Sequence, residues 1–174
     1  MRPRLFHVSD DAGIATFTPR PVPSPDSGVT GLAVWAVAES HLANYLLPRD
    51  CPRICFRAGP LTSTADAQLL LGRADRIVAF ERAWLERVRT TQLTVYELPG
   101  TAFAEVVPEA GYWISRAAVN PVGVVRVGDL MGALREEGAE VVIIDDFWPL
   151  ADAVARSTLQ FSIIRKRNAE PRGG

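Results

Sequence analysis

The sequence is poor in several residue types that often mark a function. Its 174 residues include two cysteines, Cys51 and Cys55, two histidines, His7 and His41, and a single lysine, Lys166. The cysteines are spaced C-x3-C in a predicted strand, where residues four apart are separated by about 13 Å, too far for a disulfide. We therefore expect a reduced, cytoplasmic protein in which both cysteines are small core residues.

An excess of charge and long apolar runs are also missing. The formal net charge is −1, which gives no electrostatic argument for a nucleic acid or an anionic membrane as partner. No stretch approaches the roughly 18 apolar residues of a membrane span, and the basic first residues are not followed by the apolar run of a signal peptide. We expect neither a membrane nor a nucleic acid as partner.

Common catalytic signatures are absent as well. There is no G-x-G-x-x-G, no P-loop and no G-x-S-x-G, so the standard dinucleotide, triphosphate and hydrolase motifs are not supported. The histidines and cysteines match no common metal-ligand spacing, and no metal is expected. Asp145 and Asp146 follow an apolar run. The favoured interpretation is that they cap the next helix. A hydrolase that uses these aspartates to bind a metal is the weakest alternative.

The apolar patterns predict strands and helices in irregular order, which indicates an α+β class rather than a doubly wound sheet. Residues 1–169 are expected to form a single domain, followed by a disordered tail at 170–174. Residues 101–107 are ambiguous, and the segment after Ser157 could continue as helix or become a strand, of which helix is favoured. Strands are predicted at 4–9, 32–37, 53–58, 75–81, 92–98, 111–119, 123–127 and 140–145, and helices at 39–47, 63–72, 82–91, 129–138 and 147–157.

Two motifs near the start resemble the ADP-ribosyltransferase superfamily. The run LFHVS places His7 in a first strand, and VWAVAESHLANY supplies a strand, a polar turn and a short helix that ends at Tyr45. His7 and Tyr45 lie 38 positions apart, close to the separation typical of the poly-ADP-ribose polymerases. The resemblance covers about residues 1–120 and leaves 121–169 as a C-terminal extension.

The third motif of that superfamily, a strand that carries a glutamate, is matched less well. Its best counterpart is GYWISRAAVNP, where Gly111 falls at the position of the glutamate and Glu109 lies two residues earlier. A second counterpart, QFSII, has Gln160 at that position. Glu109 or Glu81 could supply the acid in its place.

The resemblance implies a split mixed or antiparallel sheet with flanking helices that binds NAD as its substrate. His7 would orient a ribose, Val8 and Ser9 would line the nicotinamide amide, and Tyr45 would stack on the nicotinamide ring. Such stacking contributes about 0.5–1.5 kcal/mol beyond the buried area. A missing charge at the reacting centre costs a factor on the order of 10²–10³ in rate.

Arginines in loops offer a further part of the same hypothesis. Arg20, Arg49 and Arg53 could hold a pyrophosphate, since a guanidinium forms two parallel hydrogen bonds with such an anion. The favoured interpretation is that these are surface arginines that pair with Asp50. Arg165 and Arg167 near the C-terminus are expected to be solvated.

Nearly the whole chain is also similar to an uncharacterised bacterial family. The similarity rests on the runs HVS with a later F-x-P-R, NYLLPRDCPR, and LQFSIIRKRNA. Together the patterns predict a protein that binds NAD or a related small-molecule nucleotide, with ADP-ribosyl transfer to an unspecified acceptor or NAD glycohydrolysis. The alternative is a non-catalytic nucleotide-binding or regulatory module that lacks the glutamate.

Overall fold

The computed structural model describes residues 3–21 and 28–173 of the chain. Its contacts divide the chain into two compact units, each built from two segments. Unit 1 comprises residues 1–45 and 92–127, and unit 2 comprises residues 46–91 and 128–174. The class is α+β, with one antiparallel and one mixed sheet. The expectation of a single domain over residues 1–169 stays a prediction.

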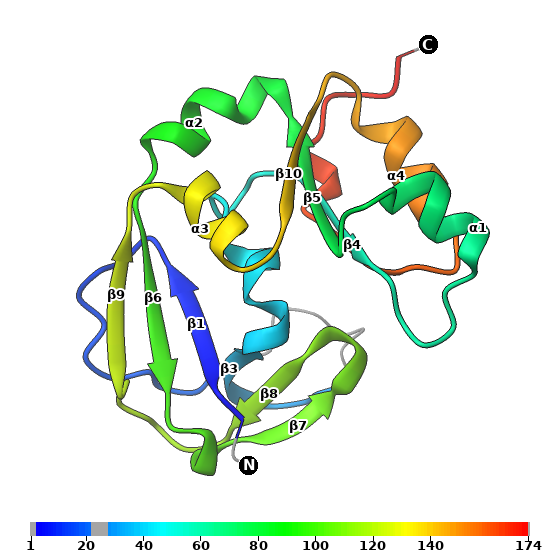
Figure 1. The fold of residues 1–174 in the computed structure, drawn as a ribbon. Coiled ribbons are helices and arrows are strands. Elements are labelled where there is room, and N and C mark those ends of the chain that lie inside the picture. Colours follow the sequence, from blue (N-terminus) through cyan, green and yellow to red (C-terminus); the bar gives the residue numbers. More distant parts are fainter. Residues whose placement is uncertain (1–2, 22–27, 174) are drawn as a thin grey trace. The chain divides into compact units, whose positions relative to one another are not determined.

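Unit 1 is built on an antiparallel sheet in which strands far apart in sequence are neighbours. The strand order is β7-β8-β3-β1-β6-β9, and the short strand β2 pairs with β3 (Figure 1). A 3-10 helix, η2 (Glu39–Tyr45), directly follows β3, and η6 (Pro108–Ala110) precedes β8. The strand bounds are β1 Leu5–Ser9, β2 Arg20–Pro21, β3 Leu32–Ala38, β6 Leu93–Leu98, β7 Ala104–Val107, β8 Tyr112–Ser115 and β9 Gly123–Val127.

The register of this sheet assigns each side chain to one of two faces. Leu5 pairs with Ala38 and Leu98, so alternate residues of β1, β3 and β6 meet on the same face. We call this face A; it carries His7 opposite Tyr96, while Phe6, Trp35 and Tyr112 lie on the other face, face B. The core of unit 1 packs on face A: Leu5, Phe17, Val34, Ala36, Tyr96, Leu98, Phe103 and Val119.

Unit 2 contains a mixed four-stranded sheet in the order β10-β5-β4-β11 (Figure 1). Strands β10 and β5 are parallel, and the other two pairs are antiparallel. Asp129 and Asp146 accept hydrogen bonds from the first turns of α3 and α4, which confirms the cap predicted for Asp146. The bounds are β4 Arg53–Arg57, α1 Thr64–Asp66, β5 Arg76–Glu81, α2 Leu85–Thr90, α3 Leu130–Glu136, β10 Glu140–Ile144, α4 Phe147–Ala155 and β11 Gln160–Ile164.

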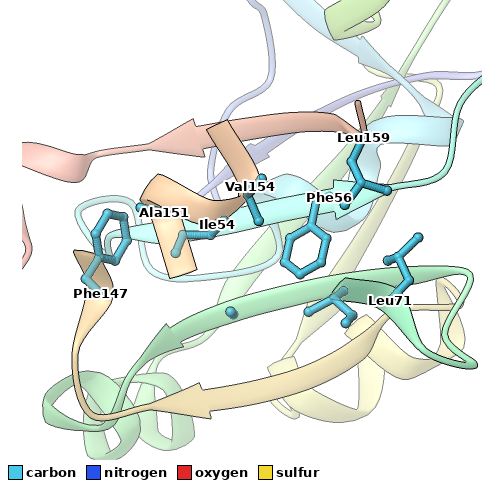
Figure 2. Close-up of a cluster of buried hydrophobic side chains, with 9 residues drawn as sticks. Ile54, Phe56, Leu71, Phe147, Ala151, Val154 and Leu159 are labelled. Atoms are coloured by element: carbon cyan, nitrogen blue, oxygen red, sulfur yellow. The ribbon is translucent and has the colours of Figure 1, made fainter. Parts of the chain in front are cut away.

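The core of unit 2 lies between α4 and its sheet. Figure 2 shows Phe147, Ala151 and Val154 of α4 beside Ile54 and Phe56 of β4. Leu71, Ile77, Ala79 and Leu159 complete the same buried cluster. Both cysteines are buried and unbonded to each other, as expected, and burial raises the pKa of each thiol to about 12.

The prediction that the helix continues beyond Ser157 is wrong. Residues Gln160–Ile164 instead form β11, which pairs antiparallel with β4 from Gln160 opposite Arg57 to Ile164 opposite Arg53. The run QFSII is too short for its apolar spacing to separate helix from strand, and its strand partner lies about a hundred residues earlier. The ambiguous segment 101–107 contains strand β7.

The C-terminal segment expected to be disordered makes contacts within unit 2. The Glu170 N–H donates to both carboxylate oxygens of Glu81, at 3.3 and 3.2 Å. Arg172 forms two hydrogen bonds with Asp152 and lies over the ring of Trp148. Gly174 lies outside the described residues.

Among the residues that the structure describes, no helix is long and apolar enough to cross a membrane.

Candidate functional site

His7 lies in the middle of β1, on face A of the unit 1 sheet. Its ring centroid is 4.9 Å from that of Phe17, and its Nδ1 atom is 3.1 Å from the carbonyl oxygen of Trp35. A carbonyl oxygen can only accept, so Nδ1 carries the proton and donates to Trp35. In the neutral ring, Nε2 is then the acceptor. The side chain is half-buried at the edge of the unit 1 core.

The pairing of β1 with β3 ends just before His7. The ladder contains Leu5 with Ala38 and Phe6 with Val37, whereas β1 continues beside β6 as far as Ser9. The Glu39 N–H donates to the Arg4 carbonyl, so the alternation of an antiparallel ladder turns the main-chain groups of Val8 toward β3. Val8 has no pairing partner in β3 within the described ladder, and we call this place the ladder opening.

Tyr45 is the last residue of η2, and its hydroxyl donates to the Tyr112 hydroxyl at 2.7 Å. Tyr112 in turn contacts Trp35 edge to face, with ring centroids 5.6 Å apart. Both Tyr112 and Trp35 belong to face B. The structure therefore anchors the Tyr45 hydroxyl on face B, through contacts within unit 1.

His7 and Tyr45 do not contact the same face of the sheet. The His7 side chain extends from face A, whereas the Tyr45 hydroxyl is held on face B. Trp35 connects the two, because its carbonyl binds His7 and its ring contacts the Tyr112 partner of Tyr45. The two residues are thus linked through β3 at the ladder opening.

The position that the resemblance assigns to a glutamate has no side chain and has no space for one. A Cβ atom on Gly111 would lie 2.4 Å from Nδ1 of His41, and Gly111 has a φ of +65°, which favours glycine. The His41 ring is held there by the Glu109 carbonyl, 3.1 Å from Nε2, and by the Ser40 hydroxyl, 2.9 Å from Nδ1. The Glu109 residue is exposed and meets His41 through its main chain.

Sequence patterns assign no role to His41, whereas two features of the structure single it out. Ser40 lies inside η2, and its hydroxyl contacts His41. The partners Glu109 and Gly111 lie about 70 residues away and come close only because β8 pairs with β3. The only local sequence feature that indicates this pair is that a histidine directly follows a serine.

The remaining expected binding residues are dispersed. Ser9 accepts a hydrogen bond from the Asp11 N–H at 3.1 Å, and Arg20 is exposed on β2 in unit 1. Arg49 is exposed in unit 2, where Asp50 approaches Arg165 at 4.0 Å. Arg53 is not at the surface: it is buried and donates to the carbonyls of Cys51 and Pro48. Their roles in anion binding stay predictions.

No metal centre is formed by the side chains that the structure describes. Within residues 3–21 and 28–173, no three His, Cys, Asp or Glu residues gather as a group that could hold an ion. Asp145 pairs with Arg82, and Asp146 caps α4. The hydrolase alternative that would use these aspartates therefore gains no support from their positions.

Comparisons with known proteins place the chain in a family and give no activity. Neither the curated proteins nor the solved structures include a match. One family of unknown function, DUF6886, matches residues 6–169, which is nearly the whole chain. The similarity to an uncharacterised family is thereby confirmed, and the chain belongs to the DUF6886 family.

Proposed function

We propose that unit 1 binds the nicotinamide end of NAD or a related nucleotide at the ladder opening. The observation that carries the proposal is that the ladder between β1 and β3 ends at Phe6, while the antiparallel alternation directs the Val8 N–H and C=O toward β3. A carboxamide presents one donor and one acceptor side by side, and the main chain of an extended residue presents the complementary pair.

His7 has the hydrogen-bonding character that a ribose hydroxyl requires. Because its Nδ1–H donates to the Trp35 carbonyl, the neutral ring has Nε2 as an acceptor. A ribose hydroxyl can donate to that nitrogen. The ring contact with Phe17 limits the orientations that the imidazole can adopt.

Tyr45 supplies the stacking surface in this proposal. Its ring is oriented by the hydroxyl contact with Tyr112, so less side-chain entropy is lost when a ligand packs against it. Arg20, exposed on β2 next to β3, is the unit 1 arginine that would meet a phosphate. Val8 and Ser9 would flank the amide.

A non-catalytic binding module is the second candidate, and the geometry at Gly111 favours it over the enzyme. The imidazole of His41 fills the space that a side chain at position 111 would need. Glu109 contributes its carbonyl oxygen to His41 and is not placed by any described contact of its carboxylate. ADP-ribosyl transfer would then need an acid from elsewhere.

Calorimetric titration with NAD, ADP-ribose and nicotinamide tests the binding. We expect NAD and nicotinamide to bind, Tyr45→Ala to weaken both by about tenfold or more, and Tyr45→Phe to weaken them less, because the ring is kept and only the hydroxyl contact that orients it is lost. Arg126→Gln, an exposed change on β9, is the matched control. Absence of binding by all three ligands would overturn the proposal.

Release of labelled nicotinamide from NAD separates the two candidates. The binding module predicts release at the uncatalysed rate, although NAD binds. Release that Glu109→Gln abolishes, with binding retained, would instead establish an enzyme that uses Glu109. Release unaffected by Glu109→Gln would also exclude the non-catalytic module and would locate the acid elsewhere.

A further inference from the structure

Ser40 and His41, neighbours in η2, form a hydrogen-bonded pair that the proposed nucleotide binding does not use. The Ser40 Oγ atom lies 2.9 Å from Nδ1 of His41. The two residues differ sharply in exposure: Ser40 is exposed, whereas His41 is only 8% exposed. The hydroxyl thus belongs to a surface residue, while the ring that it contacts is buried.

The contact on the other side of the ring determines its protonation pattern. Nε2 of His41 is 3.1 Å from the Glu109 carbonyl oxygen, which can only accept a hydrogen bond. Nε2 therefore carries the proton, and in the neutral imidazole Nδ1 is left as an acceptor. The Ser40 O–H is then the donor to Nδ1, as the hydroxyl of a nucleophile donates to its general base.

Gly111 also restricts the His41 ring, because it has no side chain and the imidazole packs directly against its main chain. A Cβ atom at position 111 would lie 2.4 Å from Nδ1 and 2.8 Å from Cγ of His41. Serine and histidine neighbours on a mobile surface would sample many rotamers. Here a main-chain carbonyl, a glycine surface and the serine itself restrict the ring, as the third group does in a catalytic triad.

We propose that Ser40 is an activated nucleophile, with His41 as its general base, that takes an acyl group from a carboxylic ester. Oγ attacks the ester carbonyl while its proton moves to Nδ1 of His41. The tetrahedral intermediate then expels the alcohol, which receives that proton, and leaves an acyl ester on Ser40. Water hydrolyses this ester to the acid and restores the serine. The inference does not depend on the nucleotide site.

An activated ester provides the direct test on the full chain. With p-nitrophenyl acetate, we expect a burst of p-nitrophenol of up to one equivalent and an acetyl group on the peptide that contains Ser40, found by mass spectrometry. Ser40→Ala should abolish both. Ser63→Ala, which changes an exposed serine in unit 2, should alter neither.

Two further measurements identify His41 as the base. His41→Gln should lower the acylation rate by about a hundredfold or more, in the usual range for loss of a positioned base. If that variant fails to fold, the pH profile of the unchanged protein decides: the rate should fall as an imidazole is protonated, and Gly111→Ala should weaken the burst by displacing the ring.

Three results would overturn the proposal. They are an unacetylated Ser40, a burst that survives Ser40→Ala, and an acylation rate that does not fall as the pH is lowered. The acylation assay contains no nucleotide, so its outcome and that of the NAD titration are independent. Failure of NAD binding therefore has no bearing on the result for Ser40.

Discussion

The hydroxyl of Tyr45 donates to the hydroxyl of Tyr112 at 2.7 Å, which joins the end of η2 to strand β8. The two residues are 67 positions apart in the sequence. Because Tyr112 also packs edge-on against Trp35, the contact forms part of an aromatic cluster on face B. The orientation of the Tyr45 ring is thus set by tertiary structure.

Removal of either hydroxyl should cost a similar amount of stability. A net intramolecular hydrogen bond contributes about 0.5–1.5 kcal/mol, so we expect Tyr45→Phe and Tyr112→Phe each to lower the unfolding free energy by that amount. In the double variant the second change should cost less, because the bond is already lost. Urea unfolding of the unchanged protein, the two single variants and the double variant gives the coupling energy between the two hydroxyls. Strictly additive losses of unfolding free energy would show that the contact contributes nothing.

The Glu81 carboxyl should make unit 2 less stable as the pH rises. Burial raises the pKa of Glu81 above its ordinary value, and the nearby carboxylates of Glu170 and Asp146 raise it further. Above the ordinary value the unfolded chain releases this proton while the folded protein retains it. The contribution of Glu81 to the unfolding free energy is therefore fully present below the ordinary pKa and is lost as the pH rises through the raised pKa of the folded state.

Glu81→Gln isolates this effect, because the amide remains neutral at every pH. The difference in unfolding free energy, variant minus unchanged protein, should increase from pH 4 upward and then reach a plateau. Glu140→Gln, at an exposed position of β10, should show no such trend. A difference that is constant or that shrinks with pH would contradict a raised Glu81 pKa.

The thiols of Cys51 and Cys55 should be unreactive in the folded protein. Both are buried, and burial raises each pKa to about 12, so almost no thiolate is present at pH 8. We expect Ellman's reagent to modify neither cysteine under native conditions and both in denaturant. Rapid native labelling of one thiol would mean that its surroundings open on the time scale of the reaction.

Much of the fold could be predicted from local patterns, whereas the contacts at the candidate site could not. The apolar strands β3, β4 and β5 lie where the sequence indicates, and Gly72 and Gly138 end helical segments with φ of +61° and +75°. These features depend on neighbouring residues. They need no knowledge of which strands pair.

The failures share a dependence on distant partners. The segment Gln160–Ile164 is a strand because β4 is available to pair with it, and its own sequence favours neither state. Likewise, nothing local to Tyr45 indicates Tyr112, and nothing local to His41 indicates that Gly111 would leave room for its ring. In each case strand pairing brings the partners together, and a sequence pattern of ten or so residues does not encode it.

Asp66 should hold the start of that unexpected strand in place. Its carboxylate accepts from the Thr158 N–H at 2.8 Å and from the Thr158 hydroxyl at 2.5 Å, two residues before β11. The hydrogen bonds with Thr158 lower the pKa of Asp66 below its ordinary value. The stabilisation is therefore present above the ordinary pKa and is lost as the pH falls through the lowered one.

Asp66→Asn should accordingly lower the unfolding free energy at pH 7, and this cost should shrink as the pH falls through the lowered pKa of Asp66 and the carboxylate takes up its proton. Thr158→Val should remove most of the same energy, so the double variant should resemble either single one. The exposed Asp75→Asn change in the same unit is the control. If the cost of Asp66→Asn does not change as the pH is lowered, the charge of the carboxylate is not what fixes the turn before β11.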